Sequence, residues 1–192
     1  MNMLIVAATD FEITSLKIRK QHVLCTGIGM VNTAVSLTKE LVSNKYDLVI
    51  NMGVAGAFSE DLVNGCVVEV IEDNFSEIGF ENDLEFMQFT DFDIQTRFYS
   101  SPRTNLKQVR AITVNTVHGN NDTISEIVKR EKADIETMEG ASVFKVCEEF
   151  NIPCLQIRSI SNRIEKRNTD QWDLDLAIRN LNFEVEKIIN NL

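Results

Sequence analysis

The sequence predicts an α/β fold with a central sheet, and two observations support this. First, apolar runs rich in β-branched residues alternate along the chain with segments whose apolar residues recur at helical spacing. Second, the chain has 192 residues, of which 44% are hydrophobic, and this is enough to bury the core of one domain over residues 1–192.

Six short apolar runs are the candidate strands, because each is rich in Val, Ile or Leu and ends near polar residues or glycine. They are Met3–Ala8, His22–Cys25, Leu48–Met52, Val67–Ile71, Ala111–Val114 and Leu155–Ile160. The segment Ile135–Ala141 adds a further strand end, which brings a carboxylate to the start of a helix.

Four segments have the apolar spacing of helices. They are Val31–Val42, Ile124–Arg130, Gly140–Phe150 and Leu174–Leu192. In the first segment the residues on one face are Val31, Ala34, Val35, Thr38, Leu41 and Val42. Asp122 or Thr123 is available to cap the second helix.

Residues 74–106 have a different character, since they are rich in Phe, Asp and Glu and show no clean period. We expect them to leave the sheet. Such loops often build the site of an α/β protein, and a plain surface insertion is an equally good interpretation.

Charge and hydropathy exclude two classes of partner. Lys and Arg number 19 against 29 Asp and Glu, and the formal charge of −10 disfavours binding to nucleic acid. No apolar run approaches the length of a membrane span, and the first residues lack the basic region of a signal peptide. We therefore expect a cytoplasmic protein with no membrane partner.

The cysteines indicate neither a disulfide framework nor a metal site. Cys25, Cys66, Cys147 and Cys154 form no C-x-x-C pair, so we expect them to be reduced and buried. With only two histidines in the chain, ligands for zinc are scarce. The sequence therefore predicts no metal and no cofactor.

Three glycine-containing turns are expected to follow strands, where glycine lets a ligand approach the backbone. They are Thr26-Gly27-Ile28-Gly29-Met30, Asn51-Met52-Gly53-Val54-Ala55-Gly56 and His118-Gly119-Asn120. The first lacks the third glycine of a dinucleotide fingerprint, and no Gly-Lys-Ser/Thr phosphate loop is present.

Polar residues near the expected strand ends are candidates for chemistry, although each also has a plain structural interpretation. Glu139 is either a helix-starting carboxylate or a ligand for vicinal hydroxyls, with Met138 as an apolar surface. Arg158 lies in an apolar strand and needs a partner, for which Glu12 or Glu139 is available. Asn162 ends the same segment, where Asn is also a common turn former.

Taken in order, these motifs resemble those of the nucleoside phosphorylase/nucleosidase superfamily, in its hydrolytic branch with the methylthioadenosine/adenosylhomocysteine nucleosidases. The matching pieces are Ala7-Ala8 with Glu12, Thr26–Gly29, Asn51–Gly56, Met138–Ala141, Arg158–Asn162 and Trp172. The resemblance implies a three-layer αβα fold with a central mixed, twisted sheet. Because only fourteen positions separate Glu12 from Thr26, we expect this fold to be shortened after the first strand, without a β-hairpin.

The resemblance also implies roles for residues in hydrolysis of an N-glycosidic bond. Glu12 would be the general base on water, with Arg158 nearby, and Asn162 would contact the leaving base. Glu139 would hold the ribose 2′- and 3′-hydroxyls, with Met138 beneath the sugar. The other expected substrate contacts are Ile28, Val54, Ala55, Gly56, Val117, Thr137, Ser161 and Trp172. In this set, the backbone near residue 117 and the indole at 172 would sandwich the base.

Within that branch, residues 72–82 resemble the segment typical of futalosine hydrolases, as do Asn162, Arg167 and Trp172. This likeness implies release of hypoxanthine from futalosine, a step of menaquinone biosynthesis. Adenine-specific members carry Asp where this chain has Asn162, whose amide N–H₂ can donate to the O6 acceptor of hypoxanthine. The benzoyl carboxylate of the substrate needs a cation, and Arg97, Arg163 or Arg167 is available.

Other functions stay open. A methylthioadenosine/adenosylhomocysteine-type nucleosidase would release adenine, and a purine nucleoside phosphorylase would require phosphate. Val54, with no Arg beside it, favours hydrolysis over phosphorolysis. A nucleoside-binding protein without turnover is a further class, although such a protein gains little from Glu12 and Glu139. In each case we expect a small-molecule nucleoside partner and, from the superfamily, a homodimer or higher homo-oligomer.

Overall fold

The computed structural model describes residues 1–83 and 85–192. The strands of its main sheet are β1 (Met3–Ala7), β2 (His22–Cys25), β3 (Leu48–Ala57), β4 (Val67–Phe75), β7 (Arg97–Tyr99), β8 (Lys107–Thr113), β9 (Ile135–Thr137) and β10 (Cys154–Arg163). A separate antiparallel pair consists of β5 (Phe80–Asn82) and β6 (Glu85–Met87). The helices are α1 (Met30–Ser43), α2 (Asn121–Glu131), α3 (Gly140–Glu149) and α4 (Leu174–Asn191). Three short 3₁₀ turns are η1 (Asp10–Glu12), η2 (Ile18–Lys20) and η3 (Thr169–Gln171).

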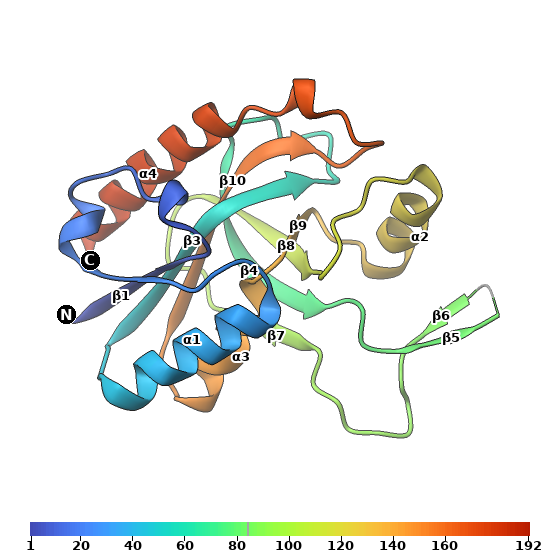
Figure 1. Ribbon diagram of the computed structural model, residues 1–192, viewed down its shortest axis with the longest axis horizontal. Coiled ribbons are helices and arrows are strands. Elements are labelled where there is room, and N and C mark those ends of the chain that lie inside the picture. Colours follow the sequence, from blue (N-terminus) through green and yellow to red (C-terminus); the bar gives the residue numbers. More distant parts are fainter. Residues whose placement is uncertain (84) are drawn as a thin grey trace.

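The main sheet is mixed, with strand order β10-β4-β8-β9-β3-β1-β2 and β7 paired to β4. Helix α4 covers one face of this sheet, and α1 and α3 cover the other (Figure 1). The predicted three-layer αβα fold is confirmed. Between Glu12 and β2 the chain forms only the turn η2, which agrees with the shortening expected after the first strand.

Five strands of the sheet close into a ring, because β10 pairs with β3 as well as with β4. Strand β10 is parallel to β3 and antiparallel to β4. The short strand β9 completes the ring between β8 and the end of β3. As a result Gly56 of β3 has two neighbours, Asn162 of β10 and Glu136 of β9.

Strand β10 has an irregularity next to this meeting point. Ile160 pairs with Ala55 and Asn162 pairs with Gly56, so Ser161 is an extra residue in β10 relative to β3. Such a bulge breaks the alternation of side chains and changes the direction of the residues that follow. Here the bulge comes directly before Asn162 and changes the direction of its side chain within β10.

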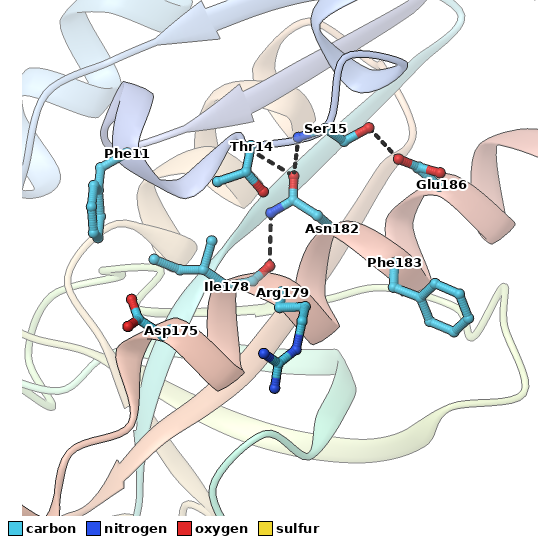
Figure 2. Close-up of a pocket in the computed structure, with 9 residues that line it drawn as sticks. All are labelled: Phe11, Thr14, Ser15, Asp175, Ile178, Arg179, Asn182, Phe183 and Glu186. Carbon is cyan, nitrogen blue, oxygen red and sulfur yellow. Dashed lines mark hydrogen bonds between the residues drawn. The ribbon is translucent and has the colours of Figure 1, made fainter.

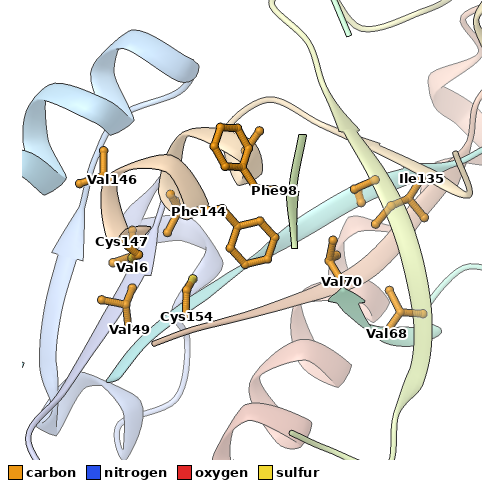
Figure 3. Packing of buried hydrophobic residues seen from close by; sticks show 14 of the residues in the cluster. Val6, Val49, Val68, Val70, Phe98, Ile135, Phe144, Val146, Cys147 and Cys154 are labelled. Carbon is orange, nitrogen blue, oxygen red and sulfur yellow. The ribbon is translucent and has the colours of Figure 1, made fainter. Parts of the chain in front are cut away.

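Two apolar clusters fill the layers on either side of the sheet. Figure 3 shows part of the first cluster, which joins the sheet to α3 and includes Val6, Val49, Val70, Phe98, Ile135 and Phe144. The second cluster lies under α4 and includes Ile5, Ile50, Met52, Ile157, Leu181 and Val185. Burying one side chain of this size stabilises a fold by about 1.5–3 kcal/mol.

Helix α1 is rotated relative to the face that its apolar spacing indicates. The prediction is wrong for four residues of that face, which are exposed: Val31 (73%), Val35, Thr38 and Val42 (70%). It is confirmed for Leu41, which is buried, and Ala34 is partly buried. The buried positions include Thr33 and Leu37. Thr33 can occupy the interior because its hydroxyl lies 3.2 Å from the hydroxyl of Thr26, which satisfies both groups.

Strand β3 is longer than expected, and this changes the interpretation of one motif. Residues 53–57, which include the predicted turn after Met52, continue the strand as far as Ala57. The register of β10 alongside them runs from Arg158 opposite Gly53 to Arg163 opposite Ala57. The glycines therefore lie in the sheet, where they allow close approach of neighbouring side chains.

Two smaller expectations also need correction. The cap of α2 is Asn120, whose side-chain oxygen accepts a hydrogen bond from the N–H of Asp122 at 2.9 Å, rather than Asp122 or Thr123. The excursion predicted for residues 74–106 is shorter at both ends. Strand β4 continues to Phe75, and β7 returns to the sheet by pairing with β4.

The cysteines differ in their environments. Cys147 and Cys154 are buried and Cys66 is partly buried, whereas Cys25 is exposed because β2 lies at the edge of the sheet. The expectation of burial is therefore wrong for Cys25. None of the described helices combines the length and the apolar character that crossing a lipid bilayer requires.

Candidate functional site

Glu12 is held in a fixed position although it follows the first strand in a short turn. Its Oε2 accepts hydrogen bonds from the N–H and the hydroxyl of Thr9, at 3.0 and 3.3 Å. Its Oε1 accepts a hydrogen bond from the N–H of Val54 at 3.2 Å. The side chain is buried. The carboxylate therefore joins η1 to the middle of β3, and two predicted site residues are in contact.

Gly53 permits Glu12 and Arg158 to lie side by side. A Cβ atom on this glycine would lie 2.9 Å from Oε1 of Glu12 and 3.0 Å from Nη1 of Arg158. Both side chains thus pack against the bare backbone of β3. Glycine is required here by this close approach.

Arg158 is almost completely buried, with 2% of its surface exposed. The expectation that Glu12 or Glu139 forms an ion pair with it is wrong for the described residues. Its Nη2 group donates to the amide oxygen of Asn51, and Nη1 donates to the carbonyl of Ile157 at 3.3 Å. Nε has no hydrogen-bond partner among the described residues. The guanidinium is thus a buried positive charge with spare donor capacity beside Glu12.

Helix α4 supports the segment that carries Glu12, as Figure 2 shows. The side-chain oxygen of Asn182 accepts hydrogen bonds from the N–H groups of Thr14 and Ser15, both at 3.0 Å. Its Nδ2 group donates to the carbonyls of Glu12 and Ile178, at 2.9 and 2.8 Å. One buried amide therefore fixes the backbone on the C-terminal side of the carboxylate.

The hollow in Figure 2 is lined on one side by Phe11 and on the other by Arg179 and Phe183 of α4. It does not include the side chain of Glu12. Its lining shares no residue with the cavity around Asn162, so the hollow lies outside the candidate site.

Glu139 lies at the start of α3, and its carboxylate contacts the backbone at the start of α1. The N–H of Gly29, which precedes α1, donates to its Oε1 at 2.9 Å. Burial raises the pKa of the Glu139 carboxyl, while this hydrogen bond and the charge of Arg158 act in the opposite direction. The predicted glycine turn at residues 26–30 and the predicted carboxylate thus come together.

The buried carboxyl group of Asp73 lies next to Gly140, the first residue of α3. Asp73 accepts hydrogen bonds from the hydroxyl of Thr113 at 2.8 Å and from Nε2 of Gln156 at 2.9 Å. A Cβ atom on Gly140 would lie 2.1 Å from Oδ2 of Asp73, so only glycine fits at this position. Burial raises the pKa of Asp73 to about 6, with both hydrogen bonds offsetting part of the shift.

A cavity of about 110 Å³ lies where β3, β9 and β10 meet. The predicted site residues in its lining are Gly56, Val117, Asn162 and Trp172. The remaining lining residues are His118, Gly119, Glu136, Arg163, Ile164, Glu165, Arg167 and Asn168. Four residues that sequence reasoning assigned to one site therefore do share a cavity.

Asn162 is anchored in this cavity with part of its hydrogen-bonding capacity in use. Its Oδ1 accepts from the hydroxyl of Ser161 at 2.8 Å, and its Nδ2 donates to the carbonyl of Arg163 at 2.9 Å. An Asn amide has two N–H donors and an oxygen with two lone pairs, so one donor and one acceptor site are left. The guanidinium of Arg167 lies 5.0 Å from the ring of Trp172 on another side of the cavity.

The other predicted residues lie around this cavity without lining it. Ala55, Thr137 and Ser161 are buried, Val54 and Met138 are partly buried, and Ile28 is exposed. The hydroxyl of Thr137 accepts from the N–H of Gly140 at 3.3 Å, which is a contact within the fold. Glu12 and Arg158 form a second group, next to β3 at Gly53, and the charges of both act on the pKa of Glu139.

Among the lining residues that sequence reasoning did not assign to the site, His118 and Glu136 contact each other. The backbone N–H of His118 donates to Oε1 of Glu136 at 2.9 Å, and its ring Nδ1 is hydrogen-bonded to Oε2. His118 was identified only as part of a glycine turn. A signal was present in Glu136, since a carboxylate inside the short apolar strand before Thr137 needs a partner.

The chain is similar to known proteins over most of its length. The family model described as Phosphorylase superfamily matches residues 5–190. A futalosine hydrolase of Streptomyces coelicolor is 25% identical over 180 residues, which cover 86% of this chain and 77% of the relative. A 5′-methylthioadenosine/S-adenosylhomocysteine nucleosidase of Psychromonas ingrahamii is 27% identical over 208 residues, covering 100% of this chain and 90% of the relative.

A solved structure shows the same fold. The chain superimposes on the 5′-methylthioadenosine/S-adenosylhomocysteine nucleosidase of Helicobacter pylori with a TM-score of 0.86 and 19% identity. The superposition covers 99% of this chain and 98% of the other. The similarity therefore extends over the whole sheet and the helices on both of its faces.

Proposed function

The chain belongs to the phosphorylase superfamily, and from this membership we propose that it is a nucleosidase that hydrolyses the N-glycosidic bond of futalosine. The products are hypoxanthine and dehypoxanthine futalosine, which assigns the reaction to menaquinone biosynthesis. The relatives include futalosine hydrolases and methylthioadenosine/adenosylhomocysteine nucleosidases, so the class of reaction is common to both. The choice between them rests on the cavity around Asn162.

In this proposal Glu12 activates the attacking water. Hydrolysis of an N-glycosidic bond passes through a sugar with oxocarbenium character, and a general base must remove a proton from water as it attacks. The carboxylate of Glu12 keeps a fixed orientation because Thr9 and Val54 bind its two oxygens. Arg158, which packs against the same glycine, places a buried positive charge next to this carboxylate.

Glu139 binds the ribose. A carboxylate accepts hydrogen bonds from two vicinal hydroxyls, and its negative charge stabilises a sugar that gains positive charge in the transition state. Gly29 occupies one lone pair of Oε1 and leaves the other acceptor sites for the hydroxyls. Met138 is partly buried beside it and provides the apolar surface for the sugar ring.

The single observation that supports hypoxanthine as the leaving base is the position of Asn162 in the cavity with Gly56 and Trp172. The amide has one N–H and one acceptor site left, which match O6 and the N7–H that forms as the bond breaks. A carboxylate at this position would repel O6. Trp172 and the backbone at Val117 enclose the faces of the base.

The proposal is tested by incubating the protein with futalosine, inosine and methylthioadenosine in buffer without phosphate, and by identifying the released base by chromatography. Hypoxanthine from futalosine is the expected result. Adenine from methylthioadenosine as the main product would assign the protein to the other nucleosidases. A strict need for phosphate would indicate a phosphorylase, and binding without release of base would indicate a nucleoside-binding protein.

The expected homodimer also stays a proposal. Helix α1 exposes Val31, Val35 and Val42 along its outer side, and an apolar stripe of this kind is typical of a surface covered by another protein. Sedimentation equilibrium of the purified protein tests it, and a monomer at micromolar concentration would contradict the proposal.

A further inference from the structure

His118 and Glu136 form a pair in the cavity that the mechanism above does not use. Both oxygens of Glu136 are bound by His118, one by the backbone N–H and the other by ring Nδ1. Only 3% of the Glu136 side chain is exposed. The ring of Phe58 packs edge-on against the imidazole of His118, with 6.3 Å between the ring centroids. The imidazole is therefore held in one orientation.

This contact determines which ring nitrogen carries the proton. A carboxylate can only accept hydrogen bonds, so in this contact Nδ1 of His118 is the donor. In a neutral imidazole the other nitrogen, Nε2, is then an acceptor. Nε2 makes no hydrogen bond to any of the described residues, and the ring lines the same cavity as Asn162 and Trp172. The pair thus offers the cavity one fixed acceptor.

The 6-oxopurines and the 6-aminopurines differ at N1, the atom that such an acceptor can contact. In a 6-oxopurine N1 carries a hydrogen and O6 is an acceptor, whereas in a 6-aminopurine N1 is an acceptor and the 6-amino group is a donor. The free N–H of Asn162 suits O6, and an acceptor at Nε2 of His118 suits N1–H. Against adenine, Nε2 would face the N1 lone pair and leave two acceptors opposed.

We propose that His118, oriented by Glu136, is a specificity-determining residue that accepts the N1–H of a 6-oxopurine base and rejects 6-aminopurines. This inference rests on the proposed function, because it assumes that the cavity around Asn162 holds the leaving base. The contact of His118 with N1–H lies on one side of O6, and the contact of Asn162 with N7 lies on the other side. The base is then recognised as hypoxanthine by two residues from different segments of the chain.

Two substitutions separate the contributions of the pair. His118→Ala removes the acceptor. Glu136→Gln places an amide N–H₂ next to Nδ1, which then becomes the acceptor, and the ring proton moves to Nε2. The second variant therefore offers a donor to the base and should favour adenine, whose N1 accepts. His22→Ala is the matched control, since His22 is the other histidine and packs against Tyr46 on the far β2 edge.

The experiment measures binding of free hypoxanthine and free adenine by isothermal titration calorimetry, which requires no turnover. We expect the wild type and His22→Ala to prefer hypoxanthine. We expect His118→Ala to reduce that preference by about tenfold. Glu136→Gln should reduce it further or reverse it. The preference is then measured in turnover, as the ratio of kcat/KM for futalosine to kcat/KM for its 6-amino analogue. Melting temperatures show whether each variant is folded.

The outcomes distinguish this inference from the proposed function. If the wild type cleaves futalosine but the preference of His118→Ala stays within about twofold of the wild type, well below the expected change, the inference is wrong and the function stands. If the base preference shifts as expected but futalosine is not cleaved, the proposed hydrolysis of futalosine is wrong. The recognition of the base by His118 is then still supported. Should Glu136→Gln fail to fold, the result for His118→Ala alone decides.

Discussion

The side-chain amide of Asn182 donates a hydrogen bond to the main-chain carbonyl of Glu12 at 2.9 Å, although 169 residues lie between them. The same amide accepts from the N–H groups of the second and third residues after Glu12. The position of the proposed general base therefore depends on a helix at the other end of the sequence.

We predict that Asn182→Ala lowers kcat by about 10- to 100-fold. A displacement of a catalytic group by about 1 Å can lower the rate by about 10²-fold. KM should change little, since Asn182 lies outside the cavity. Asn180→Ala is the matched control, because this residue of α4 donates instead to the carbonyl of Gly65 at 2.8 Å. Equal losses of kcat in both variants would mean that α4 acts only through general stability.

Glu12→Gln should remove most hydrolysis and leave substrate binding largely intact. A general base contributes about 10²- to 10⁴-fold to a rate, and glutamine keeps the shape of the side chain while losing the basic oxygen. Steady-state turnover and equilibrium binding of futalosine are the measurements. Retention of more than about a tenth of wild-type turnover would show that another group activates water.

Asn162→Asp should lower release of hypoxanthine and raise the relative rate on the adenine-containing analogue. The variant loses the N–H that faces O6, and an unpaired buried acceptor costs about 1–3 kcal/mol, or roughly 5- to 150-fold in discrimination. The readout is the ratio of kcat/KM for the two substrates, with thermal midpoints as the control. A ratio within about twofold of the wild type, in folded protein, would contradict the role of Asn162.

Asp73 should make the stability of the protein fall as the pH rises. Its folded pKa of about 6 lies above the value of 3.8 for a solvated Asp, so the folded state binds the proton more tightly. This contribution is fully present below about pH 4 and is lost as the pH rises through about 6, which amounts to about 3 kcal/mol.

The variant Asp73→Asn isolates this effect. Asn does not titrate, and its N–H₂ can donate to Oε1 of Gln156, which has no partner among the described residues. Free energies of unfolding from denaturant titrations at several pH values should converge or cross for the two proteins as the pH increases from 4 to 7. Parallel curves would show that Asp73 is not the group that titrates.

The sequence was sufficient to predict the layers of the fold and four of the residues that line the cavity around Asn162. Glu12, Val54 and Glu139 were assigned through the resemblance to the nucleosidase superfamily, because local pattern alone is equally consistent with ordinary helix-start carboxylates at 12 and 139. The face of α1 could not be predicted from local pattern. Thr33 is buried because Thr26 supplies a hydrogen bond, and the apolar spacing of the helix contains no information about that partner.

The neighbours of Gly56 were also beyond reach of the sequence. They result from closure of the strand ring, which brings β9 and β10 to the same glycine from opposite sides. Glu136 and His118 meet because β8 pairs in parallel with β9, which brings the turn after β8 next to β9. Their pairing depends on the tertiary arrangement of segments whose local patterns indicate only a short strand and a turn.

Closure of the ring has a consequence for how quickly the protein acquires activity during folding. Strand β10 pairs with β3 across more than one hundred residues, from Cys154 opposite Val49 onward, so this contact has high contact order. Bringing such distant segments together costs chain entropy before any pairing is gained, and it slows folding. Arg158 and Asn162 reach Gly53 and Gly56 only through that pairing. Recovery of hydrolysis after dilution from denaturant should therefore lag behind the return of helical signal.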